Sequence, residues 1–207
     1  MNEYDTTKLK EQIQTELTAT RYAIQSIEDA VENSDRGASQ SVVKYQISSP
    51  LIDWSTGSNG KQEVYSGRMD NYAVKRGAAN RVSAMLVGTT YEIITQEECK
   101  YWNKYLLHEI PEMVFLQQVR HGVFHGNEFV LDSYDGGAKW NGVEITNEMQ
   151  GHTVFSEIDW DNSRFIPDPD LPEGHGHSTE VVNEGLLEAG DGLALAQTAI
   201  DILDKCD

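Results

Sequence analysis

Apolar residues recur at alternating steps of four and three near both ends of the chain, and this spacing restricts what both ends can form. Such steps keep a narrow stripe on one side of an α-helix, where the stripe packs against another helix. The pattern therefore predicts long amphipathic helices over residues 1–35 and 178–207. The N-terminal stripe comprises Ile13, Leu17, Thr20, Ile24, Ile27 and Val31, and the C-terminal stripe comprises Val182, Leu186, Ala189, Leu193, Ala196, Ile200 and Leu203.

The two stripes have alternative partners. A stripe at this spacing is typical of a helix that lies on the core of its own chain, but it also fits packing between copies of the chain. Thr20 interrupts the N-terminal stripe, so that helix is not an ideal zipper. The residues predicted to form interfaces are the apolar members of both stripes and one tryptophan: Ile13, Leu17, Ile24, Ile27, Val31, Trp54, Leu186, Leu193, Ile200 and Leu203.

The segment 36–62 has the composition of a loop. It is rich in Ser, Gly, Asn and Gln, and Gly57-Ser58-Asn59-Gly60 predicts a turn. Loops of this length are uncommon inside compact domains unless they bind something. We interpret the segment as a contact arm that orders against a neighbouring subunit, with Trp54 among its anchors. Plain flexibility is the alternative.

Residues 63–177 are predicted to form an α+β core. Helical spacing predicts central helices at 69–86 and 113–120, and Thr95 with Glu98 resembles a capping box that opens another helix. Residues 91–94 predict a short strand. Apolar and polar residues then alternate over 129–132, 139–145 and 153–160, which predicts a small antiparallel β-meander, followed by an extended connection at 161–177. The whole chain of 207 residues is predicted to form one α+β domain.

The chain is strongly acidic. It has 34 acidic and 16 basic residues, which give a formal net charge of −18. A field of this sign repels phosphate backbones and anionic lipids, so we expect neither sequence-specific nucleic-acid binding nor membrane binding. Three explanations of the acidity remain open: solubility, a source that lives at high salt, and a basic partner surface.

The location of the protein is limited by what the sequence lacks. The first twenty residues have no apolar core of a signal peptide, and no apolar run approaches the roughly 18 residues that span a bilayer. Two cysteines, Cys99 and Cys206, are too few for a disulfide framework. We therefore expect an intracellular protein, or one carried in a virion, that is not secreted by a signal peptide.

Four residues come nearest to a metal site. His121 and His125 are four apart, and Asp159 and Asp161 resemble the start of a calcium loop. The glutamate of a zinc-protease motif is absent, Gly122 and Gly126 argue against a continuous helix, and the later positions of a calcium loop do not match. The sequence thus predicts no catalytic residue, no metal site and no cofactor.

The function predicted from these observations is assembly. We expect a non-enzymatic structural subunit of a homo-oligomeric ring or particle, whose partners are copies of itself and other assembly proteins. A virion component, such as a head–tail connector, neck or capsid-associated protein, is the first hypothesis. The alternatives are a metal-assisted hydrolase that uses the His and Asp groups and an acidic intracellular adaptor that binds a basic partner.

Overall fold

The computed structural model describes residues 6–32, 72–96, 101–167 and 176–206. Within these ranges only the backbone is described for residues 28–32, 72–75, 101, 160–167 and 176–181. The contact arm predicted at 36–62 with Trp54 lies outside the described residues, and so do Cys99 and the side chains of Val31 and Asp161.

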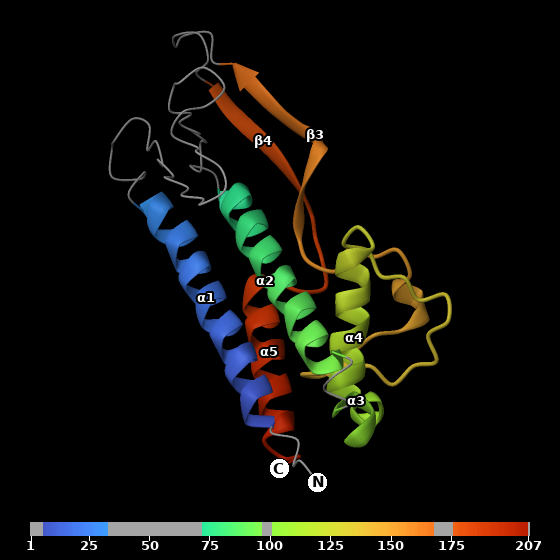
Figure 1. Ribbon diagram of the computed structural model, residues 1–207. Helices are drawn as coiled ribbons and strands as arrows, with labels where there is room; N and C mark the ends of the chain where they lie inside the picture. The colour runs from blue at the N-terminus through green and yellow to red at the C-terminus, as the bar shows by residue number, and fades with distance from the viewer. Residues whose placement is uncertain (1–5, 33–71, 97–100, 168–175, 207) are drawn as a thin grey trace, which may run out of the picture.

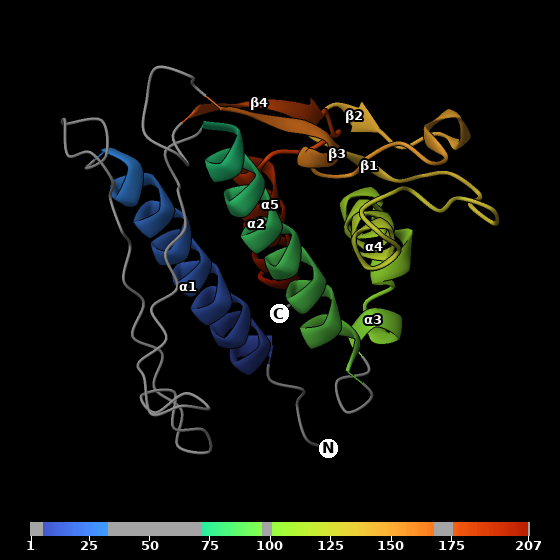
Figure 2. The same cartoon turned by 90° about the horizontal axis from the view of Figure 1, so that it is seen from above.

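Three helices form the main body of the fold: α1 (Thr6–Glu32), α2 (Tyr72–Thr95) and α5 (Ala189–Leu203). Figures 1 and 2 show them side by side, with α4 (Pro111–Phe124) on the other side of α2 from α1. The start of α1 meets the end of α5, where Lys10 Nζ lies 2.7 Å from Asp204 Oδ1. The start of α2 meets the residue before α5, where Arg76 Nε donates to Glu188 Oε1 at 3.1 Å, and the middle of α2 meets the start of α5, where Ser83 Oγ donates to the Ala189 carbonyl at 2.7 Å. Helix α1 is therefore antiparallel to both others.

The N-terminal helix is confirmed, and its stripe packs within the chain. Leu9, Ile13 and Leu17 are buried, with Thr20 at the next turn. Ile24 and Ile27, farther along α1, are half-buried. The steps of three and four thus placed the apolar side of α1 against α2 and α5.

The C-terminal helix is shorter than predicted. Residues Gly176–Asn183 form strand β4, so the predicted start of the helix near residue 178 is wrong. Val182 pairs with Ile158 of strand β3 (Glu157–Pro167). Helix α5 begins only after a capping box in which the Asp191 carboxylate accepts from the Glu188 backbone N–H at 2.9 Å. Strand pairing, and not the helical spacing of the apolar residues, therefore determines the structure of residues Gly176–Asn183.

The predicted strand at 91–94 is also wrong, because α2 continues through it. Ile93 and Ile94 are buried in the core from a helix. Thr95 is the last residue of α2, and its hydroxyl donates to the Tyr91 carbonyl at 2.9 Å, whereas its predicted capping partner Glu98 lies outside the described residues. Burial on the helix bundle decides the structure here, and the β-propensity of Tyr and Ile does not.

Two short helical segments, α3 (Tyr101–Lys104) and η2 (Leu107–Glu109), lead into α4. Pro111 is the first helical residue of α4, a position where its missing N–H costs nothing. The helix predicted at 113–120 is confirmed within α4.

The described strands form two separate two-stranded antiparallel sheets, β1–β2 and β3–β4, and the predicted single meander is not found. Strands β1 (Lys139–Trp140) and β2 (Val143–Glu144) meet at an Asn141-Gly142 turn whose φ angles are 49° and 81°. Two positive φ angles are typical of the tight hairpin turns that favour Asn-Gly. A short helical turn, η3 (Asn147–Met149), follows, and the β3–β4 hairpin projects past the start of α2 (Figure 1). The α+β class is confirmed.

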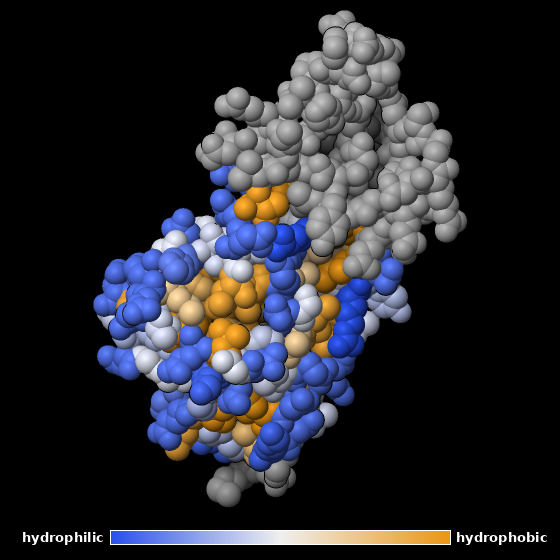
Figure 3. All heavy atoms as spheres, turned by 180° about the vertical axis from the view of Figure 1, so that it is seen from behind, coloured by the Kyte–Doolittle hydropathy of each residue, from blue (hydrophilic) through white to orange (hydrophobic). Residues whose placement is uncertain are grey.

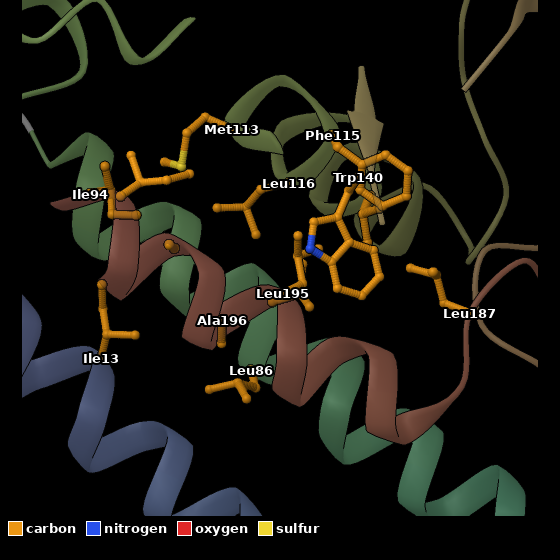
Figure 4. Close-up of a cluster of buried hydrophobic side chains, with 14 of the residues drawn as sticks. Ile13, Leu86, Ile94, Met113, Phe115, Leu116, Trp140, Leu187, Leu195 and Ala196 are labelled. Atoms are coloured by element: carbon orange, nitrogen blue, oxygen red, sulfur yellow. The ribbon is translucent and has the colours of Figure 1, made fainter. Parts of the chain in front are cut away.

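One apolar core joins these parts. Figure 4 shows side chains from α1, α2, α4 and α5 converging with Trp140 of β1. The rings of Phe115 and Trp140 have centroids 5.7 Å apart, and Trp140 Nε1 donates to Thr198 Oγ1 at 3.0 Å. The β1–β2 hairpin is thereby fixed to both α4 and α5.

Candidate interaction surfaces

Apolar side chains gather in the open where α2 meets α4. Met85 is 66% exposed and Phe124 is 61% exposed, although such side chains are usually buried. Phe124 lies over Gly88, because an ideal Cβ on Gly88 would stand only 2.6 Å from Phe124 Cε2. Met85 and Gly88 are three residues apart and so share one side of α2. Met85 and Phe124 therefore lie next to each other on the surface.

Arginines border these apolar side chains. The Arg120 guanidinium carbon lies 4.9 Å from the centroid of the Phe124 ring, and Arg120 Nε donates to Glu92 Oε1 at 3.0 Å. Arg81, one turn before Met85, is exposed. We call Arg81, Met85, Arg120 and Phe124 the α2–α4 face. Methionine, aromatic residues and arginine are enriched at protein interfaces.

A second apolar surface lies on α5. This helix stands behind α1 and α2 in Figure 1, so it faces the viewer in Figure 3, where hydrophobic surface is visible between hydrophilic areas. The exposed or half-buried residues on the outside of the helix are Gly190, Leu193, Ala194, Gln197 and Asp201, which we call the α5 face. No lysine or arginine occurs between residues 184 and 204. The face is therefore apolar with an acidic border.

The predicted interface residues divide between the core and the surface. Four of them are buried by their own chain and so belong to its core: Ile13, Leu17, Ile200 and Leu203. Leu186 and Leu193 are partly buried against that core. The sequence stripes therefore identified packing within the chain better than they identified open surface.

The α2–α4 face was not predicted from the sequence. The only signal was that residues 82–94 carry apolar side chains on all sides of a helix, whereas a surface helix has one apolar side. Most of that apolar surface is covered within the chain, because α2 packs against α1, α4, α5 and β3, and Met85 is the large apolar side chain that remains exposed.

The His121–His125 pair lies beside a surface cavity. The two imidazole rings have centroids 4.3 Å apart. The sequence suggested that Gly122 interrupts the helix here, but α4 continues through it. It is needed there, because a Cβ would stand 2.5 Å from Val154 Cγ2. Burial lowers the pKa of His121, and the charges of His125 and Arg120 lower it further. The cavity, of about 420 Å³, is lined by Tyr91, Gln117, Gln118, Arg120, His121, Val130, Asp132, Ser133 and Tyr134.

The four candidate metal ligands lie on two different elements of the structure. His121 and His125 belong to the end of α4, whereas Asp159 and Asp161 belong to β3. Within the described part of the chain, no group of three or more His, Cys, Asp or Glu side chains is placed to hold one ion.

We expect the purified protein to carry no stoichiometric zinc. Zinc sites use three or four protein ligands, and the His121–His125 pair supplies two. Metal analysis of protein prepared without chelators checks this. One zinc per chain that disappears in the His121→Ala/His125→Ala variant would contradict it.

A polar cluster ties α2 to the segment before α5. Arg76 donates to Glu188 through Nε at 3.1 Å and through Nη2, and to Glu184 Oε2 at 2.6 Å. Ser156 Oγ donates to Glu188 Oε1 at 2.7 Å, and Asn80 Nδ2 donates to the Ser156 carbonyl at 2.8 Å and to Glu188 Oε2 at 2.9 Å. These hydrogen bonds fix the start of α2 to the segment that leads into α5.

The same contacts set the charge of Glu188. Partial burial by itself raises the pKa of this carboxyl, but hydrogen bonds from Arg76, Ser156 and Asn80 outweigh burial and hold the pKa at about 2. Hydrogen bonds to Glu188 and Glu184 raise the pKa of Arg76. Glu188 therefore stays ionised in the folded protein well below the pH at which it protonates in the unfolded chain.

Glu188 should make stability depend on pH in the acid range. A lowered folded-state pKa stabilises the fold above the unfolded value near 4.5, and this contribution is lost as the pH falls towards 2. We expect the melting temperature of the wild type to fall more steeply over this window than that of Glu188→Gln. Glu148→Gln removes an exposed carboxylate and serves as the matched control. Identical pH profiles for wild type and Glu188→Gln would contradict the assignment.

Comparison with known proteins gives no family for this chain: no family model, no curated protein and no solved structure matches it. Among the described helices, none has the length and apolar character needed to cross a bilayer.

Proposed function

We propose that this protein is a non-enzymatic structural subunit that assembles with copies of itself into a ring or particle. The observation that carries the proposal is the α2–α4 face, where Met85 and Phe124 stand exposed beside Arg120. Exposed apolar side chains that are contiguous and bordered by polar groups mark interaction sites. The hydrogen bonds of the polar cluster around Arg76, by contrast, join parts of the chain to each other.

Within this class we place first a virion component, such as a head–tail connector, neck or capsid-associated protein. Such subunits need surfaces for two neighbours, and the α2–α4 and α5 faces supply two. The sequence of segment 36–62 adds Trp54 and other apolar anchors in a loop-like composition, which fits a contact arm.

An acidic adaptor for a basic partner is the second candidate. It is favoured by the absence of lysine and arginine between residues 184 and 204 in a chain of net charge −18. Such an adaptor would bind a cationic protein surface and would have no need to bind copies of itself.

Mass measurement in solution tests the proposal. We expect the full chain to form one species of defined stoichiometry above a threshold concentration, seen by light scattering and native mass spectrometry at several salt concentrations. Added salt screens the self-repulsion of chains with net charge −18, so assembly should persist or increase as the salt concentration rises. A chain that stays monomeric under all these conditions overturns the proposal and favours the adaptor.

A further inference from the structure

We propose that copies of this chain join head to tail, with the α2–α4 face of one copy seated on the α5 face of the next. This inference rests on the proposed function and specifies the contact through which assembly occurs. The occupant of the α2–α4 face is thus a second copy of the same chain.

The two faces point in opposite directions. Ser83 of α2 and Gly192 of α5 face each other, because an ideal Cβ on Gly192 would stand 2.2 Å from Ser83 Oγ. Met85 follows Ser83 by two residues and Ala194 follows Gly192 by two, which turns each about 200° around its helix. Met85 therefore lies on the side of α2 away from α5, and Ala194 lies on the side of α5 away from α2.

Opposite faces favour a heterologous contact. In a two-fold symmetric dimer the same patch meets itself, whereas contact between two different patches continues from copy to copy. A series of such contacts closes into a ring when the rotation between neighbours permits it. The placement of the two faces on opposite sides of the α2–α5 pair therefore suits a ring, or an open filament where the rotation does not close, better than an isolated dimer.

The chemistry of the two faces is complementary. The α2–α4 face presents two large apolar side chains, Met85 and Phe124, with the exposed Arg81 on one side and the Arg120–Glu92 ion pair on the other. The α5 face presents small residues and the half-buried Leu193, with exposed Asp201 beside them. Arg81 would thus meet a helix that carries no lysine or arginine and exposes Asp201, whereas two Arg81 side chains would approach each other if two α2–α4 faces met.

Mixing two variants tests the head-to-tail contact. The double variant Met85→Ser/Phe124→Ser removes the two large apolar side chains of the α2–α4 face and leaves the α5 face intact. Ala194→Arg blocks the α5 face and keeps the other, and Gly190→Arg is a second blocking variant because a Cβ there meets nothing within 4 Å. Each variant alone should lose association and have the mass of one chain. A one-to-one mixture should form a dimer and nothing larger, because only one intact junction is left.

Two controls separate the contact from general effects. Leu106→Asn changes an exposed leucine outside both faces, at a residue whose φ of 51° suits Asn, and should assemble as the wild type does. Ala194→Glu adds bulk with the opposite charge and should weaken association less than Ala194→Arg, because Glu faces Arg81 and Arg120 across the contact. Circular dichroism confirms that each variant is folded.

The outcomes distinguish this inference from the proposed function. Wild type that assembles while either face variant keeps the full mass means that other surfaces join the copies, so the head-to-tail contact is wrong and the assembly function stands. A mixture that stays monomeric overturns the pairing of these two faces. Wild type that is monomeric under all conditions overturns both.

Discussion

Replacing Leu17 with aspartate is expected to abolish the folded state at neutral pH. Leu17 of α1 is fully buried against the other helices of the bundle. Truncating a buried leucine costs about 2–5 kcal/mol, and a carboxylate without a partner adds several more. Since domains of this size are stable by about 5–15 kcal/mol, the loss consumes most of the margin. Urea unfolding followed by circular dichroism should show no cooperative transition, or one close to zero denaturant.

Neighbouring positions on α1 provide graded controls. Glu16 is exposed, so Glu16→Ala should change the free energy of unfolding by less than about 0.5 kcal/mol. Ile24 is half-buried, and Ile24→Asp should fall between these two variants. The order must not depend on protein concentration, because the stripe packs within one chain. An effect of Leu17→Asp that disappears on dilution would show instead that α1 packs against another copy.

The helix α1 was predictable because its sequence and its surroundings agree. One apolar stripe with polar residues elsewhere predicts a helix whichever partner covers the stripe, and Ile13 and Leu17 are buried as the spacing requires. The strand predicted at 139–145 is divided by the Asn141-Gly142 turn into β1 and β2, and this division follows from a local property, the positive φ that both residues tolerate.

Segments with two competing solutions were not predictable. The stripe from Val182 to Leu203 reads as one helix, but Val182 is held by pairing with Ile158 of β3, which spacing along the chain does not reveal. Residues 91–94 have the composition of a strand and still form the last turn of α2, because Ile93 and Ile94 fill the core there. In both cases a contact with a segment far away in the sequence determines which secondary structure forms.

The candidate surfaces were the hardest part to predict, since they depend on which side of a helix is left uncovered. The exposure of Phe124 follows from how α4 crosses α2, and its seat on Gly88 joins residues from two helices. The polar cluster is similar: Arg76 and Glu188 are 112 positions apart in the sequence. Neither arrangement has a local pattern that sequence reading can detect.

Replacing Gly185 with alanine should be nearly as damaging as a charge in the core, although alanine adds one methyl group. An ideal Cβ on Gly185 would stand 2.4 Å from the Phe155 carbonyl carbon and 2.4 Å from the Ser156 nitrogen. These are backbone atoms, so no side-chain rotation relieves the clash. The Gly185 N–H also donates to Ser156 Oγ at 2.9 Å, and Phe155 forms a bridge with Leu187, so a shift disturbs both contacts. We expect a loss of about 3 kcal/mol or more.

Gly190→Ala is the matched control, because it adds the same methyl group five positions later at a site where nothing lies within 4 Å. Alanine is favoured over glycine in helices, and Gly190 is the second residue of α5, where this preference is weaker than in a helix interior, so the variant should be unchanged or slightly more stable. Both variants are compared by thermal and urea unfolding at concentrations below any association, since Gly190 lies on the α5 face. Equal stability of Gly185→Ala and Gly190→Ala would mean that the chain does not pass this closely over Phe155 and Ser156, and the path from β4 into α5 would then need revision.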